Sequence, residues 1–323
     1  MKMMRLRKQI ATQLFFAMVV MAGSQAQAEQ QSVDQRLDVR PDGIVSVVVV
    51  RGDIRVEGWN KNQVEVRGVL DEKLEEFIFE VNEDETIIWV RIPRNTRGGW
   101  GRNNETELVI RIPVKSKIEI SGVSTDINIS GVEASVEVGV VSGDVTLRGG
   151  ADRIILQTVS GEIELRDVSG RIRVKTVSGD IESYDTTGTS RYGSVSGSLL
   201  IEDGDKELEL ETVSGDIEVV STRFVSITGH SVSGDVDIRG EMIEGGSVDF
   251  DNVSGSIRLK LGGDINSKFD LETGSGSIRN RLTNDKSKVL KYVRDERLRF
   301  VVGAGDGEVN FSTRSGDITV SRH

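Results

Sequence analysis

The chain has 323 residues, a formal net charge of −11 and no cysteine. The lack of cysteine excludes disulfide bonds, and the acidic balance argues against nucleic-acid binding. Glycine occurs 36 times and proline only 3 times, while aromatic residues make up 5% of the chain. This composition indicates many sharp corners and little room for large rings in the core.

The first 28 residues have the pattern of a secretory signal peptide. A start with four basic residues precedes an apolar run from Ile10 to Ala22, and the segment ends in Ala26-Gln27-Ala28. We expect cleavage after Ala28, which changes the net charge from −11 to −15 because four basic residues leave. The run is short for a membrane span, and we expect no transmembrane segment in the mature chain. Export is therefore predicted, foremost to the periplasm, with the cell surface or secretion as alternatives.

Residues 29–323 are expected to form one domain that begins with a β cap at 33–118. Its predicted strands follow no fixed repeat; they are Ile44–Val50, Ile54–Val56, Val64–Val66, Phe77–Val81, Ile87–Ile92 and Glu107–Ile112. The end of a stack of repeats needs a cover, and we assign that role to this region.

Residues 119–278 repeat a short motif. Val-Ser-Gly occurs eight times in the chain, and its glycines are 18 residues apart from Gly143 through Gly161, Gly179 and Gly197 to Gly215. The period divides into two nines, since Gly170 lies midway between Gly161 and Gly179. Such a fixed period is typical of stacked repeat proteins.

The apolar residues follow the same period. Successive steps of two, three and four residues join Ile163, Leu165, Val168, Ile172, Val174, Val177 and Ile181. A step of two indicates strand alternation, and the longer steps, which contain glycine, indicate corners. Two nine-residue half-coils then return the chain to its start, one coil further on. The pattern predicts an all-β fold, a parallel β-solenoid or β-helix with coils of about 18 residues, in which all these apolar residues form core ladders.

Residues 279–302 interrupt the repeats. This segment holds eight basic and three acidic residues in an acidic protein, and we interpret it as a basic insertion before the final coil at 303–323. A late copy of the motif, Ser315-Gly316-Asp317, supports that last coil.

An acidic ladder follows the corner glycines. Asp144, Glu162 and Asp180 occupy the same place in three successive coils, where carboxylates could attract Ca²⁺. The Gly-Gly-x-Gly frame of calcium-binding nonapeptides is absent, so we interpret the acids as solvated corner residues and keep a calcium-binding solenoid as the alternative. We predict no bound metal and no cofactor.

Catalysis is the less favoured hypothesis. Only His230 and His323 could serve as an imidazole base, and a serine repeated eight times cannot be a unique nucleophile. A polysaccharide-active enzyme that uses carboxylates alone stays as a further alternative. The tripeptide Arg51-Gly52-Asp53 matches an adhesion motif, but we interpret it as a corner.

Two segments outside the repeat are the candidate binding sites, because loops on rigid scaffolds often carry function. Arginines beside a tryptophan could stack on a sugar or hold an anionic group, and the basic insertion offers further cations. The candidate residues are Arg94, Arg97, Trp100 and Arg102 in the first segment, and Lys291, Tyr292 and Arg294 in the second. The partner would be an envelope protein or a glycan, and the oligomeric state stays open.

The sequence resembles the bacterial putative-adhesin family of β-strand repeat proteins, a domain of unknown function. The resemblance is carried by Gly52-Asp53-Ile54 near the start, Arg111-Ile112-Pro113 before the coils, the repeated Thr-Val-Ser-Gly-Asp-Ile, and the closing Gly305-Asp306-Gly307. It implies a β-helix-like fold and no catalytic residue. We therefore expect an exported, non-enzymatic, adhesin-like or envelope-associated binding protein.

Overall fold

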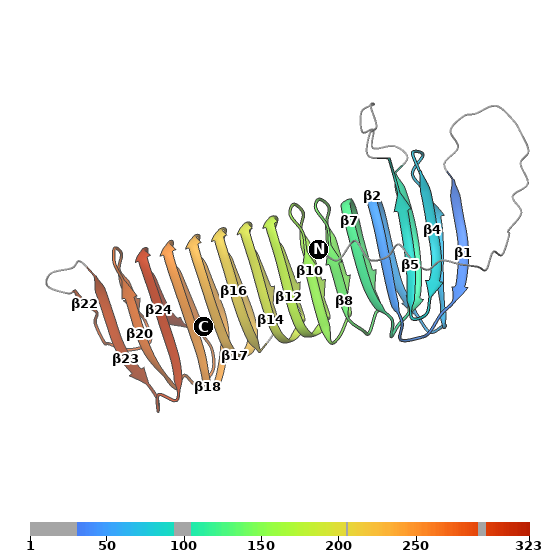
Figure 1. Ribbon diagram of the computed structural model, residues 1–323. Coiled ribbons are helices and arrows are strands. Elements are labelled where there is room, and N and C mark those ends of the chain that lie inside the picture. Colours follow the sequence, from blue (N-terminus) through green and yellow to red (C-terminus); the bar gives the residue numbers. More distant parts are fainter. Residues whose placement is uncertain (1–30, 94–104, 205, 290–294) are drawn as a thin grey trace, which may run out of the picture.

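The structure, a computed structural model, describes residues 31–93, 105–204, 206–289 and 295–323. These residues form strands β1 to β25 and no helix. The strands stack into a long rod, a parallel β-solenoid, as Figure 1 shows. The predicted fold class is confirmed. No helix long and apolar enough to cross a membrane occurs among the described residues.

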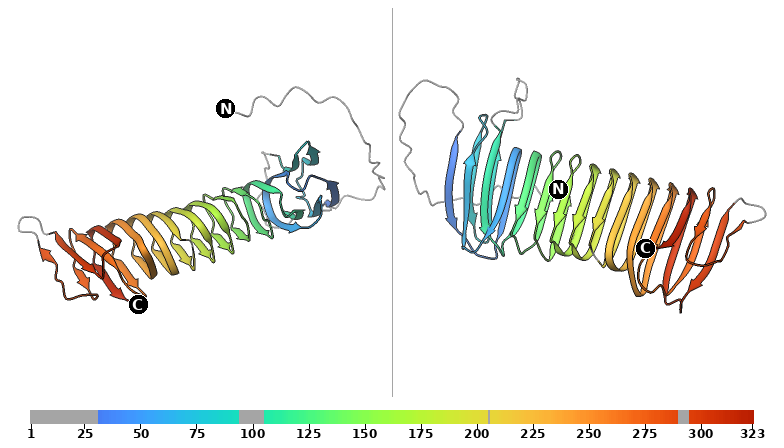
Figure 2. Two further views of the ribbon diagram at one scale, coloured as in Figure 1. Left: turned by 90° about the horizontal axis from the view of Figure 1, so that it is seen from below. Right: turned by 180° about the vertical axis from the view of Figure 1, so that it is seen from behind.

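Each regular coil has two short strands on opposite faces of the rod. We call face A the sheet that contains β8 (Val136–Gly139), β10 (Arg153–Gln157), β12 (Ser169–Ser178), β14 (Thr187–Ser196) and β16 (Glu207–Ser214). Face B contains β9 (Val145–Arg148), β11 (Ile163–Arg166), β13 (Ile181–Tyr184) and β15 (Leu199–Glu202). The longer β17 (Ile217–Ser233) and β18 (Val236–Ser254) run from face B around a corner onto face A. The stacked coils are visible end to end in Figure 2.

The register confirms the 18-residue coil. Ile163 pairs with Ile181, which pairs with Leu199, each in a parallel ladder. On face A, Ile154 pairs with Ile172 in the same way. Side chains of both faces meet inside the coil and are fully buried at most ladder positions. Burial of one such side chain contributes about 1.5–3 kcal/mol, so the thin core gains its stability from the number of coils.

One part of the predicted core is wrong. The valines of the Val-Ser-Gly motif at the long corner are half exposed, at 46–49%, and Val123 at the equivalent place is 45% exposed; the motif valines are Val141, Val159, Val177, Val195, Val213, Val232 and Val253. Strand alternation continues past Val174 to a buried Thr176, so Val177 points outward. The next buried residue after Val174 is therefore Thr176, two residues further on, and not Val177, three residues further on. Val168, at the opposite corner, is buried as expected.

The corner glycines are required by close stacking. Gly215 has φ +148°, and a Cβ atom there would lie 2.2 Å from the carbonyl oxygen of Gly197 in the preceding coil. A Cβ atom at Gly234 would lie 2.1 Å from the carbonyl oxygen of Gly215. Any side chain at this corner would force neighbouring coils apart, which explains why the motif repeats so strictly.

The N-terminal cap is organised around one long strand near the start of the described chain. β2 (Ile44–Trp59) pairs on its inner side with β7 (Lys117–Ser130) and on its outer side with β5 (Glu85–Arg91) and β6 (Thr106–Pro113). Beyond these, β4 (Glu76–Asn82) pairs antiparallel with β5, and β1 (Ser32–Asp38) and β3 (Gln63–Val69) continue the edge antiparallel. Antiparallel hairpins thus end the parallel stack at this end.

The C-terminal end has the same arrangement. β24 (Gly307–Ser315) lies between β18 and β20 (Ser267–Thr273), and Figure 1 shows it in that place. β25 (Ile318–Arg322) lies between β19 (Ile257–Leu261) and β21 (Ile278–Asn280). β23 (Glu296–Val302) covers β20 antiparallel and pairs with the short β22 (Lys288–Val289). The coil that comes last in sequence is therefore not last in space.

Candidate functional site

Three neighbouring strands of face A present a concentrated charge pattern to solvent. Because residues alternate inward and outward, each strand shows every second side chain. The outward residues are Arg171, Arg173 and Lys175 on β12, Thr189, Arg191 and Gly193 on β14, and Glu207, Glu209 and Glu211 on β16. The register places them in three rows across the sheet. The three outward residues of β12 in these rows are thus all cations, and the three of β16, two strands along, are all anions.

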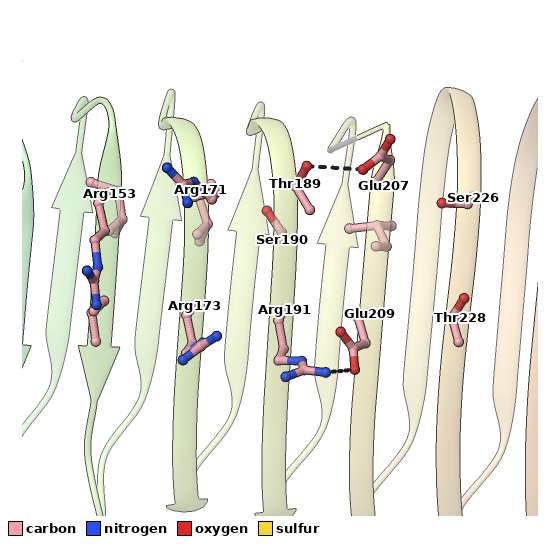
Figure 3. A pocket seen from close by; sticks show the side chains of 14 residues that line it. Arg153, Arg171, Arg173, Thr189, Ser190, Arg191, Glu207, Glu209, Ser226 and Thr228 are labelled. Carbon is pink, nitrogen blue, oxygen red and sulfur yellow. Dashed lines mark hydrogen bonds and ion pairs between the residues drawn. The ribbon is translucent and has the colours of Figure 1, made fainter.

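A groove crosses these strands, and we call it the arginine groove. Figure 3 shows two of its rows, Arg171, Thr189, Glu207 and Ser226 in one, and Arg173, Arg191, Glu209 and Thr228 in the other. Its outward lining residues are Arg153, Ile155, Arg171, Arg173, Thr189, Arg191, Glu207, Glu209, Ser226 and Thr228. Four arginines from three successive coils therefore line one concave surface of an acidic protein.

Some of these charges are already paired. Arg191 forms an ion pair with Glu209 on the next strand, a cross-strand contact of the kind that stabilises sheets. The hydroxyl of Thr189 donates to Glu207 at 3.1 Å. The Nε–H of Arg191 is buried and has no acceptor among the described residues.

The remaining arginines of the groove, and Lys175 beside them on β12, have no carboxylate partner in the described part of the chain. Among the described residues, Arg153, Arg171, Arg173 and Lys175 have no carboxylate within ion-pair distance. Guanidinium groups bind phosphate, sulfate and carboxylate through two parallel hydrogen bonds. The arrangement can therefore hold an oxyanion against β12.

The acidic ladder at the corner has a structural role. Each aspartate of the ladder accepts a hydrogen bond from the backbone N–H of the equivalent residue in the neighbouring coil, for example Asp126 from Asp144 at 2.9 Å and Asp180 from Ser198 at 2.7 Å. The same contact joins Asp216 to the N–H of Asp235 at 2.8 Å. Among the described residues no group of three or more acidic or histidine side chains could hold a metal ion.

The pKa values along this ladder differ. The N–H of Ser256, together with Arg258, holds the pKa of Asp235 below its usual range. The N–H and hydroxyl of Ser277 lower the pKa of Asp317 in the same way. Burial, reinforced by neighbouring carboxylates, raises the pKa of Glu162 instead.

The adhesion-like tripeptide is not presented to solvent as a unit. Arg51 is 4% exposed, and its guanidinium donates to Asp71 at 2.5 and 3.0 Å. Asp71, 1% exposed, also accepts the backbone N–H of Lys73 at 2.8 Å. Arg51 therefore fastens the segment after β3 to the cap, as expected for a corner residue.

The binding residues predicted from sequence lie outside the described residues. Arg94, Arg97, Trp100 and Arg102 fall between β5 and β6, and Lys291, Tyr292 and Arg294 fall between β22 and β23. Of the basic insertion, the described Arg297 donates to Asp270 at 2.9 and 2.6 Å, and Arg299 donates to the same carboxylate at 2.9 Å. These two arginines hold β23 on β20 and lower the pKa of Asp270.

Sequence reasoning missed the arginine groove. The available signal was the alternation in Arg171-Ile-Arg-Val-Lys175, which recurs as Glu207-Leu-Glu-Leu-Glu211 two coils later. Only the 18-residue period brings those two segments near each other.

Comparison with solved structures gives distant matches. A protein named putative adhesin from Parabacteroides distasonis is 14% identical, with 72% of this chain and 98% of that chain covered and a TM-score of 0.42. A putative adhesin from Bacteroides fragilis is 13% identical over 93% and 100% of the two chains, with a TM-score of 0.36. A putative lipid binding protein, also from P. distasonis, is 13% identical over 90% and 96%, with a TM-score of 0.36.

Comparison with curated proteins gives no match. A family model described as Toastrack DUF4097, a domain of unknown function, matches residues 45–321, which include every coil of the solenoid. The chain therefore belongs to the Toastrack DUF4097 family.

Proposed function

We propose that this chain is an exported, non-enzymatic, adhesin-like binding protein of the cell envelope that captures an anionic group in the arginine groove. The group would belong to a glycan or to an envelope protein. The observation that carries the proposal is the set of three groove arginines, Arg153, Arg171 and Arg173, without carboxylate partners among the described residues. In a chain of net charge −11, such a cluster opposes the overall field and attracts anions locally.

Other features support parts of the proposal. The basic and apolar pattern of residues 1–28 supports export through a signal peptide. The rigid parallel stack supports a binding role, because it fixes the outward side chains of successive strands about 4.8 Å apart. The residues Arg94, Arg97, Trp100 and Arg102, together with Lys291, Tyr292 and Arg294, remain proposed secondary contacts with the same partner.

Capture on a glycan array tests the groove. The array carries phosphorylated, sulfated, carboxylated and neutral glycans, and the protein is applied at low and at high salt. We expect the anionic glycans to be retained, with weaker retention at high salt. The double variant Arg171→Ser/Arg173→Ser should lose at least about tenfold in affinity, because two charge-assisted contacts disappear.

The matched control is Arg55→Ser/Arg148→Ser, which removes the same charge from exposed arginines of face B. Equal losses in the two double variants would show that only net charge matters and would refute the groove. Retention of neutral glycans alone, or cleavage of any glycan, would refute the proposed function. Trp100→Ala tests the secondary contact: unchanged capture of an envelope partner would rule it out.

A further inference from the structure

The arginine groove contains a second feature beyond its cations, which is a wall of carboxylates. On face A, the outward residues of β12 from 171 to 175 are all cations and those of β16 from 207 to 211 are all carboxylates, with β14 between them. The middle residue of the row Arg171, Thr189 and Glu207 is small, and the backbones of the two charged residues lie two strand spacings apart, about 9.6 Å.

A long polyanion along the rod axis does not fit this arrangement. After Arg153, Arg171 and Arg173 it would meet Glu207 and Glu209, and in the opposite direction it would meet Glu137 and Glu119. Carboxylates thus bound the cationic patch on both sides along the sheet. The anionic part of a ligand is limited to the width of about three coils, roughly 14 Å.

A small ligand with both charges fits better. A ligand that makes charge-assisted hydrogen bonds to both strands must place its anionic and cationic centres within reach of side chains whose backbones are about 9.6 Å apart. A phosphate ester and an ammonium group separated by two carbon atoms are short enough to lie between them. The hydroxyl of Thr189 and the unpaired Nε–H of Arg191 lie between the two charged strands.

We infer that the arginine groove recognises a zwitterionic phosphoester, with the phosphate held by Arg171 and Arg173 and the ammonium held by Glu207. The inference rests on the proposed function, since it specifies the anion that the groove captures. The Arg191–Glu209 pair completes the floor of the site between the two ends of the ligand. The phosphoester could be a lipid head group or a decoration of a glycan.

Calorimetric titration with phosphoethanolamine, inorganic phosphate and ethylamine tests the inference. Phosphoethanolamine should bind about tenfold more tightly than phosphate, because the ammonium adds a second charge-assisted contact. Glu207→Gln should remove that advantage and leave phosphate binding intact, since it keeps the Arg191–Glu209 pair and an acceptor for Thr189. Glu202→Gln, which changes an exposed glutamate of face B, is the control of equal charge change and should have no effect.

The outcomes separate the two ideas. If neither phosphate nor phosphoethanolamine binds, the proposed anion capture fails together with the inference. If phosphate binds through Arg171 and Arg173 but the ammonium adds nothing, or if Glu207→Gln and Glu202→Gln behave alike, only the zwitterion inference fails. Vesicles of phosphatidylethanolamine and of phosphatidylglycerol then identify the source. Binding to the former alone supports a lipid head group, and binding to free phosphoethanolamine without vesicle binding supports a soluble or glycan-borne ester.

Discussion

The Val-Ser-Gly corner and the outward surface of face A belong to the same coils, yet they differ in one respect. At the corner, coil after coil presents the same residues, an exposed valine, a serine, a glycine and then usually an acid. On face A, each coil presents different outward residues, cations on β12 and carboxylates on β16. Regular positions are those where coils must stack, and variable positions are those where neighbouring coils impose no requirement. In a solenoid, recognition is therefore to be sought among the variable outward positions.

The largest expected effect is at a corner glycine. Gly215→Ala places a methyl group against the carbonyl of Gly197 at a positive φ and should cost about 3 kcal/mol or more in free energy of unfolding. Gly139→Ala on face A is the control, because nothing lies within 4 Å of its Cβ position, and it should change stability by less than about 1 kcal/mol. Urea denaturation measures both. Similar losses of stability in the two variants would show that the corner is no more sensitive to an added side chain than face A.

A smaller effect separates the two kinds of valine in one coil. Val219→Ala removes a fully buried side chain and should cost about 2 kcal/mol. Val213→Ala affects a side chain that is 48% exposed and should cost less than about 1 kcal/mol. Thermal unfolding of the two variants gives the comparison. A larger loss at Val213 would show that the exposed valine ladder, not the inner core, holds the corner.

The acidic ladder should respond to pH in opposite directions at two positions. Asp235 has a lowered pKa, so its stabilisation is present above the unfolded value of about 3.9 and disappears as pH falls through the folded pKa. Asp235→Ala should therefore cost about 1 kcal/mol at pH 7 and little at the lowest pH. Glu162 has a raised pKa, so Glu162→Gln should be neutral or stabilising at pH 7, and this gain should vanish below about pH 4.3.

Denaturation midpoints of both variants and the unmodified protein, measured from pH 7 to pH 2.5, check these signs. A loss at Asp235 that is independent of pH would show that the carboxylate acts by shape and not by charge. A destabilising Glu162→Gln would contradict the raised pKa.

The smallest effect on stability is expected on face A. Arg173→Ser changes an outward side chain with no carboxylate partner among the described residues, so the free energy of unfolding should stay within about 0.5 kcal/mol. The same variant should lose affinity for phosphate in titration. A variant that unfolds easily and still binds phosphate would reverse the roles assigned to corner and face.

Much of the fold could be predicted because the coil length appears in the sequence as a repeat of fixed period. The 18-residue spacing of Gly161, Gly179 and Gly197 sets the coil, and the buried ladders follow from strand alternation. The exposed position of Val177 could not be read from hydrophobicity, since a threonine takes the buried place before it. The position of β24 between β18 and β20 was also beyond the sequence pattern, because a motif shows that a coil forms but not which coils it joins.

The candidate site was less predictable for a related reason. Departures from the repeat were sought in whole segments, 94–102 and 279–302, whereas the charged strands β12 and β16 keep the repeat and vary only in their outward residues. If the sequence is written in rows of 18 residues, Arg171, Thr189 and Glu207 fall in one column, and they are neighbours across the sheet. The depth of the groove depends on how neighbouring side chains of different size pack, which the repeat pattern does not show.

The intercalated coil of β24 and β25 has a consequence for how the protein reaches its native state. The strands β20 and β21 precede this coil in the chain but contact β18 and β19 only through it. The stack cannot therefore form one coil after another in chain order to this end. Strands β20 and β23 can pair with each other, but β20 and β21 can join the stack only after residues 307–322 are in place. Contacts of such long sequence separation form slowly, so completion of the C-terminal cap should be the late, rate-limiting step of folding.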